Sequence, residues 1–99
     1  MTRIALANLD FPPSPQASVE AAVAAIGEAA DAGAELICFP ECFVPGYRAH
    51  GSGPQPATSE WLEAAHEVVR AAAAQHGIAV VLGTERIVAG RYRITALVI

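Results

Sequence analysis

The sequence predicts an α/β fold in which strands and helices alternate around a largely parallel sheet. Three observations support this class. Apolar runs occur at residues 36–39, 78–82 and 96–99, two longer segments carry apolar residues at helical spacing, and glycines and prolines separate these segments. The expected order is strand, helix, strand, helix, strand, strand. Right-handed crossovers through the helices would make most of the sheet parallel.

The first strand and the first helix are expected near the N-terminus. Residues 3–9 form a short apolar run that two prolines follow, which is typical of a buried strand and a turn. Ser14 and Pro15 have the form of a helix cap followed by proline at the first helical position. The helix is therefore predicted over residues 15–32, ending at Gly33.

A second strand and a long loop follow this helix. Residues 36–39 are continuously apolar, and Pro40 ends the run because it lacks the backbone donor that a strand requires. Residues 42–57 hold several glycines and prolines, so they are expected to form a loop of the kind that often carries function. Glu41 therefore lies where the strand ends and the loop begins.

The second half of the chain predicts one more helix and two strands. Thr58 and Ser59 are candidate caps, and Gly77 ends the helix that follows them. A third strand is expected over residues 78–82. After a glycine turn, residues 92–99 form the fourth strand, which can pair with the third as a hairpin.

Two helices can cover only one face of such a sheet. The unbroken apolar character of the strands indicates that both faces require cover. We therefore hypothesise a missing second layer, supplied by more of the same chain or by a partner chain.

Composition excludes several classes of function. The chain has 99 residues, a length that suits a single domain with a modest core, and its net charge is -4. Its six basic residues are scattered arginines, so neither nucleic acid nor an acidic membrane is an expected partner. No segment resembles a signal peptide or approaches the roughly 20 apolar residues of a membrane span. A cytoplasmic location with reduced cysteines is expected.

Glu41 is the main candidate for chemistry. Sites in parallel sheets form beyond the carboxyl ends of the strands, and Glu41 is predicted to lie there. Walls formed by Phe39, Phe43, Val44 and Tyr47 would partly desolvate its carboxylate and make it a usable general base. The alternative interpretation is a solvated glutamate in a turn.

Other reactive side chains are given structural roles. Cys42 is adjacent to Glu41, but neighbours in an extended segment point to opposite sides, so Cys42 is interpreted as a partly buried structural thiol. Cys38 is expected in the core. The spacing of these cysteines and His50 does not suit zinc, so no metal is expected.

Three polar residues in the second half are given surface roles. His66 and His76 lie on the predicted second helix, where solvated or capping roles are expected. Glu85 is a weaker candidate than Tyr47 for the substrate side of a pocket, because a carboxylate at a hairpin edge is usually solvated.

A resemblance sharpens these expectations. The run Phe39-Pro40-Glu41-Cys42-Phe43-Val44-Pro45-Gly46-Tyr47, preceded by Asp31-Ala32-Gly33-Ala34-Glu35-Leu36-Ile37, resembles the first signature block of the nitrilase superfamily of carbon-nitrogen hydrolases. The resemblance implies the N-terminal part of a four-layer αββα sandwich whose second layer is incomplete in this chain. Residues 1–99 would then be a single partial CN hydrolase domain.

The resemblance also implies a mechanism. The family uses a triad of glutamate, lysine and cysteine to hydrolyse small amides, nitriles or carbamoyl compounds, with no metal or organic cofactor. Glu41 corresponds to the glutamate. The resemblance implies that the lysine and the cysteine lie further along the chain than Ile99, and this sequence indeed has no lysine. Family members commonly assemble as homo-oligomers.

The resemblance makes Tyr47 a candidate substrate-binding residue, although an aromatic ring packed under the loop is an equal alternative. The sequence departs from the family where Tyr92 is followed by Arg93 instead of the common asparagine. The loop over residues 48–56 is also unusual, so the substrate cannot be transferred from any one subfamily.

Two other functions compete with hydrolysis. A nucleotide-binding module is disfavoured because Asp10-Phe11-Pro12-Pro13, and no glycine-rich phosphate loop, follows the first strand. A non-catalytic fragment or partner protein that buries its open sheet face on another chain is compatible with the lack of lysine.

Overall fold

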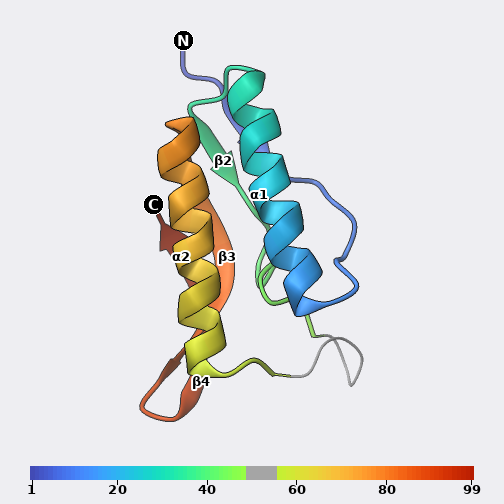
Figure 1. The fold of residues 1–99 in the computed structure, drawn as a ribbon, viewed down its shortest axis with the longest axis vertical. Coiled ribbons are helices and arrows are strands. Elements are labelled where there is room, and N and C mark those ends of the chain that lie inside the picture. Colours follow the sequence, from blue (N-terminus) through green and yellow to red (C-terminus); the bar gives the residue numbers. More distant parts are fainter. Residues whose placement is uncertain (49–55) are drawn as a thin grey trace.

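The computed structural model describes residues 1–48 and 56–99, and its elements follow the predicted order (Figure 1). In chain order they are β1 (Ile4–Leu6), α1 (Pro15–Asp31), β2 (Leu36–Cys38), α2 (Ser59–His76), β3 (Ala79–Val88) and β4 (Arg91–Val98).

Local signals set the ends of the two helices. The Ser14 hydroxyl accepts a hydrogen bond from the amide of Ala17 at 3.1 Å, and Pro15 begins α1 as predicted. The Thr58 hydroxyl caps α2 in the same way. Gly77 ends α2 in the left-handed conformation, with φ at 63°. These caps explain why both helices lie within a residue or two of their predicted bounds.

The four strands form one mixed sheet in the order β1-β2-β3-β4. β1 pairs with β2 and β2 with β3 in parallel, whereas β3 and β4 form the antiparallel hairpin. The predicted α/β class and the predicted hairpin are therefore confirmed. One row of paired residues crosses the whole sheet, from Leu6 through Cys38 and Val81 to Val98.

The lengths of two strands differ from the predictions. β3 does not end at residue 82, because it continues to pair with β4 as far as Val88 and Arg91. β1 is shorter than the predicted residues 3–9, because it pairs only with the three residues of β2. The hairpin therefore extends well beyond the parallel half of the sheet.

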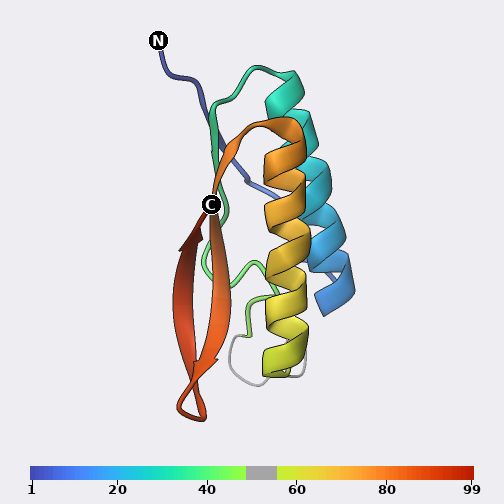
Figure 2. The same cartoon turned by 60° about the vertical axis from the view of Figure 1, so that its left-hand side comes forward.

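Both helices lie on the same face of the sheet (Figure 2). The core lies between these two layers, and its fully buried large side chains include Ile26, Ile37, Leu62, Val69, Val80 and Leu82. Burying each such side chain contributes about 1.5–3 kcal/mol. The helices therefore stabilise this one face.

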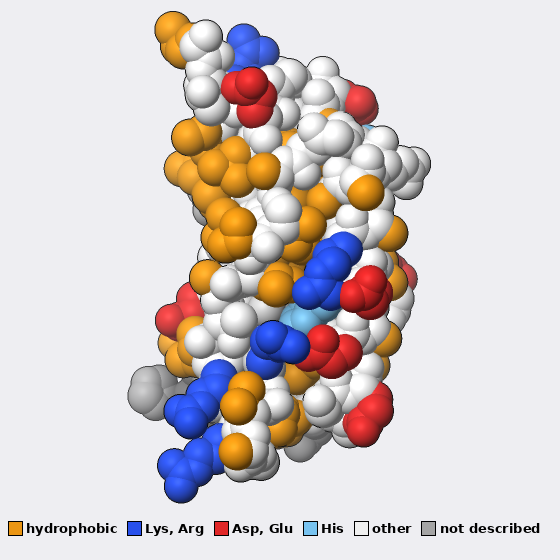
Figure 3. All heavy atoms as spheres, turned by 90° about the vertical axis from the view of Figure 1, so that its left-hand side faces the viewer, with side chains coloured by type: hydrophobic (Ala, Val, Ile, Leu, Met, Phe, Trp, Pro, Cys, Tyr) orange, Lys and Arg blue, Asp and Glu red, His pale blue; other side chains and the backbone are white. Residues whose placement is uncertain are grey.

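The other face of the sheet carries exposed apolar side chains. Leu6 and Val98 belong to the row that crosses the sheet, and their exposed fractions are 76% and 74%. Side chains two residues apart share a strand's face, so Ile4 and Ile94 lie on it too. Hydrophobic side chains gather at the upper left in Figure 3. The prediction that two helices cover only one face is confirmed.

Candidate functional site

The residues that follow β2 bring Glu41 to the carboxyl ends of the parallel strands. The Phe39 amide still donates to the carbonyl of Val81 on β3, at 2.9 Å. The chain then turns, and the Val44 amide returns to donate to the carbonyl of Gly83 at 3.2 Å. Glu41 lies between these two attachments. Its predicted position, at the edge where sites form in parallel sheets, is therefore the observed one.

The turn passes directly over Gly83. A β-carbon on Gly83 would lie 1.8 Å from the carbonyl oxygen of Pro40 and 2.9 Å from the α-carbon of Glu41. No side chain fits in this space, because real β-carbons essentially never come within 3.0 Å of another heavy atom. Glycine at this position therefore allows the backbone of Glu41 to lie against β3.

Backbone hydrogen bonds close the turn on itself. The Phe43 amide donates to the Pro40 carbonyl at 3.3 Å, and the Gly46 amide donates to the Cys42 carbonyl at 3.1 Å. Cys42 has a φ of 51°, which is uncommon for a residue other than glycine. The peptide bond before Pro45 is cis. We call residues 39–47 the glutamate loop.

The Glu41 side chain is exposed, which differs from the expected partial desolvation. Three of the four side chains expected to surround Glu41 point into the core, and the fourth, Tyr47, is exposed. Phe39 and Phe43 are buried in the core, where their ring centroids lie 5.3 Å apart, and Val44 is fully buried. These apolar side chains hold the loop against the sheet, and they leave the Glu41 carboxylate on the outside.

Cys42 is buried, as its structural interpretation predicted. Its sulfur lies 3.9 Å from the carbonyl oxygen of Thr84. Burial, together with the negative charges of Glu85 and Glu41, raises the pKa of the Cys42 thiol. Because the thiolate is the nucleophilic form, this environment disfavours Cys42 as a nucleophile. Cys38 differs from its expected core position, since it is half-buried in the row of residues on the open face.

Glu85 is buried, so its interpretation as a solvated hairpin carboxylate is wrong. Only 3% of the residue is exposed. Its Oε1 atom lies 2.7 Å from Nη1 of Arg48, the residue that follows the glutamate loop. The guanidinium carbon of Arg48 also lies 5.6 Å from the centre of the Tyr92 ring. Arg48 is thus the ion-pair partner of the buried Glu85.

His66 also differs from its expected surface role, because it is fully buried. One of its ring nitrogens, Nε2, lies 2.9 Å from the hydroxyl oxygen of Thr84, which joins α2 to β3. Burial lowers the pKa of His66. His66 follows Leu62 by four residues and precedes Val69 by three, so the helical periodicity of the sequence contained the signal for its burial. His76 is exposed in the last turn of α2, as expected.

Tyr47 is exposed at the end of the glutamate loop instead of packed beneath it. Its ring stacks on that of Phe11, with 6.4 Å between the centroids. A hollow of about 270 Å³ opens at the carboxyl ends of β1 and β2, and its lining includes Leu6, Asn8 and Pro40. The hollow reaches the glutamate loop at Pro40, the residue before Glu41, whereas Tyr47 is not part of its lining.

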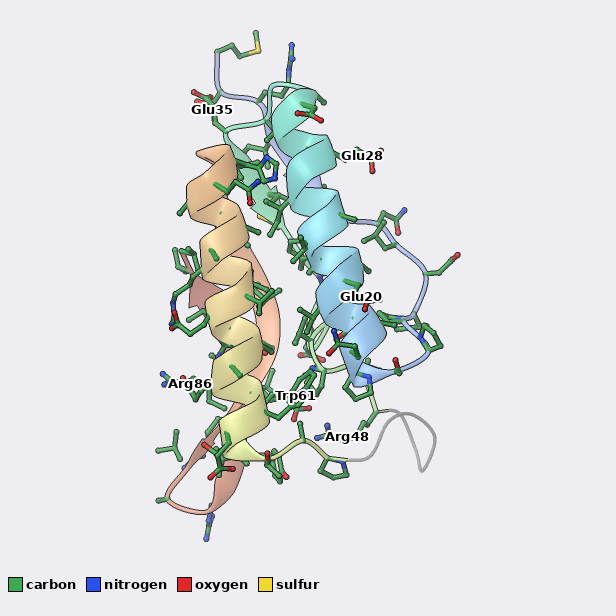
Figure 4. The ribbon with its side chains drawn as sticks, in the orientation of Figure 1. Glu20, Glu28, Glu35, Arg48, Trp61 and Arg86 are labelled. Carbon is green, nitrogen blue, oxygen red and sulfur yellow. The ribbon has the colours of Figure 1, made fainter. Side chains whose placement is uncertain are left out.

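A larger groove lies elsewhere. It measures about 510 Å³, runs between α1 and α2, and has Val19, Val23, Trp61 and Val68 in its lining. Figure 4 shows Trp61 between the two helices. Because this groove has no catalytic side chain and lies on the helix layer, it is not part of the candidate site.

The prediction that the two cysteines and His50 hold no metal involves one residue, His50, that lies outside the described residues. Within residues 1–48 and 56–99, no three histidine, cysteine or acidic side chains gather as a metal site requires. Neither described helix has the length and apolar character needed to cross a membrane.

Comparison with known proteins assigns the family. The family model described as carbon-nitrogen hydrolase matches residues 3–99. No curated protein sequence matches the chain.

Solved structures of an amidase from Nesterenkonia sp. share the fold. A glutamate-to-glutamine mutant of the strain AN1 amidase, with acrylamide added to its active-site cysteine, is 27% identical with a TM-score of 0.77. A further structure of the AN1 enzyme, named NitN amidase, is 28% identical with a TM-score of 0.76. Each alignment covers 99% of this chain and 39% of the amidase chain.

The chain therefore spans about two-fifths of the length of the amidase that it matches. The family match extends over nearly all of its residues, and the order of its strands and helices is that of part of a nitrilase-fold amidase. The chain belongs to the carbon-nitrogen hydrolase family, the nitrilase superfamily.

Proposed function

We propose that the full-length protein hydrolyses the carbon-nitrogen bond of a small amide, nitrile or carbamoyl compound, and that Glu41 is its general base. The observation that carries this proposal is the position of Glu41. Its backbone is fixed against Gly83 at the carboxyl edge of the sheet, and its carboxylate is exposed there. A base must reach the proton that it removes, and an exposed carboxylate on a fixed backbone meets that requirement.

The proposed reaction of an amide has two halves. Glu41 takes the proton of a cysteine thiol, and the sulfur attacks the amide carbon. The carbon-nitrogen bond then breaks, and the amide nitrogen takes that proton from Glu41 and leaves as ammonia, which gives a thioester. Water then hydrolyses the thioester, releasing the acid and the thiol. A lysine stabilises the negative charge that develops on the substrate oxygen. Since this chain has no lysine, we place the lysine and the reacting cysteine C-terminal to Ile99.

The similar amidase supports this choice of chemistry. One of its structures holds acrylamide added to the active-site cysteine, and another holds acrylamide in a variant lacking both a glutamate and a cysteine side chain. These structures favour a small amide as the substrate class. Tyr47, which is exposed at the end of the glutamate loop and stacks on Phe11, is proposed to contact the substrate.

A second candidate function follows from the open face of the sheet. Exposed Ile4, Leu6, Ile94 and Val98 form an apolar surface of the kind that a folded protein covers. In a non-catalytic protein, this apolar surface would be the binding interface for another chain. In the hydrolase proposal, further residues of the same polypeptide cover it, and the protein forms homo-oligomers in the cytoplasm.

The two candidates make different predictions for the complete reading frame. The hydrolase proposal predicts a lysine and then a cysteine beyond Ile99, and release of ammonia when the purified protein is incubated with acrylamide, aliphatic nitriles or carbamoyl amino acids. Cleavage of one of these classes identifies the substrate. A complete protein that lacks the lysine and cysteine, and releases no ammonia, supports the non-catalytic candidate.

A further inference from the structure

The burial of Glu85 requires an explanation, because ionised side chains are almost never fully buried unless they are paired. Its side chain is 4% exposed, and Arg48 is its ion-pair partner, with a side chain that is 27% exposed. The two groups are close enough for an ion pair, but their geometry does not meet that of a hydrogen bond between Arg48 Nη1 and Glu85. Such a pair resists separation, because removing one charge leaves the other buried and uncompensated.

The strand places this ion pair beside the glutamate loop. Glu85 lies two residues beyond Gly83 on β3, so both positions belong to the same face of the sheet. The backbone of Pro40 and Glu41 crosses that face at Gly83, and Arg48 follows the loop and reaches Glu85. The loop is therefore attached to β3 at the Gly83 crossing and again at Glu85.

β4 adds a further contact to the second attachment. In the hairpin register Tyr92 pairs with Ile87, which places Tyr92 on the same face as Glu85. Arg48 lies over its ring, and the Tyr92 hydroxyl donates to the Ala57 carbonyl at 3.0 Å. Arg48 therefore has a carboxylate and an aromatic face as neighbours, and both belong to the β3–β4 hairpin.

We propose that Arg48 and Glu85 are positioning residues, and that their ion pair holds the glutamate loop so that the Glu41 carboxylate is fixed before substrate binds. This inference rests on the proposed role of Glu41 as general base. Neither residue needs to touch the substrate. Their effect on the rate follows from geometry, since misplacing a catalytic group by about 1 Å can lower the rate about a hundredfold.

Hydrogen exchange tests the attachment independently of activity. In the full-length protein, Arg48→Met should increase the exchange rates of the Val44 and Gly46 amides at least tenfold, because their hydrogen bonds close the loop. The Val80 amide, bonded to Ile99 within the sheet, should exchange at its wild-type rate. Unchanged exchange at Val44 and Gly46 would overturn the inference, whatever the activity of the enzyme.

Kinetics test the consequence for catalysis. Arg48→Met and Glu85→Gln should each lower kcat at least tenfold and leave KM within about twofold, because neither side chain binds substrate. The double variant should be no slower than the worse single variant, since both changes break the same contact. Arg48→Lys keeps the charge and should recover part of the rate. If Arg48→Met does not fold, Arg48→Lys is compared with Glu85→Gln. A kcat between those of Glu85→Gln and the wild type, with unchanged KM, supports the inference, and a wild-type kcat in both variants contradicts it.

Arg86→Met is the matched control. Arg86 follows Glu85 on β3 but faces α2, where its Nε atom donates to Glu63 at 3.1 Å. Figure 4 shows Arg86 and Arg48 on opposite sides of α2. This variant removes an arginine-glutamate pair that is more exposed than the Arg48–Glu85 pair and does not involve the glutamate loop, so it should retain wild-type kcat.

The possible failures are distinguishable. An unchanged kcat in Arg48→Met, combined with an inactive Glu41→Gln variant, refutes the positioning role and leaves the proposed function intact. An active Glu41→Gln variant refutes the proposed function, while the exchange rates still decide whether Arg48 holds the loop.

Discussion

Gly83 of β3 lies directly against Pro40, so close that a β-carbon on the glycine would lie 1.8 Å from the proline carbonyl oxygen. This contact joins the strand to the loop that carries Glu41. The Val44 amide adds a hydrogen bond to the Gly83 carbonyl at 3.2 Å. The position of the candidate base therefore depends on a residue without a side chain, far from it in the sequence.

Gly83→Ala should disturb both stability and activity. The added methyl group meets backbone atoms, which cannot rotate away, so the loop or the strand must shift. Over-packing of this kind costs about 1–3 kcal/mol. Urea denaturation measures the loss of stability, and ammonia release measures the accompanying loss of kcat.

Gly27→Ala is the control for this substitution. Gly27 lies within α1, where a β-carbon would meet only the end of the His76 side chain, at 3.3 Å. Alanine also favours helix by about 1 kcal/mol over glycine. This variant should be as stable as the wild type or more so, and equal losses in both variants would contradict the role assigned to Gly83.

His66 should make stability depend on pH. Burial lowers its pKa below the ordinary value of 6.5; of the charges nearby, Glu63 and Glu67 oppose this change, whereas Arg70 and Arg86 add to it. As the pH falls below 6.5, the unfolded chain binds a proton more readily than the folded one, so the free energy of unfolding decreases until the pH reaches the folded-state pKa. The contribution is complete above pH 6.5. A tenfold difference in proton affinity between the folded and unfolded states corresponds to about 1.4 kcal/mol of stability.

Denaturation of His66→Gln over the same pH range isolates this contribution. Glutamine can still hydrogen-bond to Thr84 but does not titrate, so the decrease in stability below pH 6.5 should be smaller than in the wild type. His76→Gln, altered at the exposed end of α2, should behave like the wild type. Identical pH profiles for His66→Gln and the wild type would show that His66 is protonated equally in both states.

Cys42→Ala should retain activity. The Cys42 thiol is buried against Thr84 and its pKa is raised, so it lacks the thiolate that attack on a substrate requires. We expect kcat within about threefold of the wild type. The smaller buried side chain should also cause a modest loss of stability. Loss of all ammonia release in a folded Cys42→Ala protein would make Cys42 the nucleophile and would require a different mechanism.

Tyr47→Ala should weaken substrate binding more than catalysis. Tyr47 is 44% exposed and stacks on Phe11, so its ring is available at the surface of the loop that carries Glu41. We expect KM to increase at least fivefold with kcat changed less. Tyr47→Phe keeps the ring and should have nearly wild-type KM. An unchanged KM in Tyr47→Ala would leave the tyrosine with a packing role alone.

Features set by neighbouring residues were predictable from the sequence. Ser14, Pro15, Thr58 and Gly77 cap or end helices through contacts within a few residues, so the helix bounds required no knowledge of the rest of the fold. The place of Glu41 followed from Pro40, which ends an apolar run. The burial of His66 was also predictable, because His66 lies on the same face of the helix as Leu62 and Val69.

Features set by distant contacts were not predictable. Thr84 and Glu85 interrupt the apolar pattern of β3, so the strand was expected to end before them. The two side chains are buried on opposite faces of the sheet. Thr84 contacts His66 on the helix side, and Glu85 contacts Arg48 on the other side. The exposure of Glu41 had a similar origin, since the phenylalanines expected to surround it turn into the core. Each outcome depends on the tertiary packing of segments far apart in sequence.

The replacement of Glu41 by glutamine is the most direct test of the central claim. Glutamine has nearly the same shape but cannot accept the thiol proton, so a folded Glu41→Gln variant of the full-length protein should lose at least a thousandfold in kcat. Glu28→Gln, which alters an exposed glutamate on α1, should keep wild-type kcat. If Glu41→Gln releases ammonia as fast as Glu28→Gln, then Glu41 is not the base and the proposed mechanism is wrong.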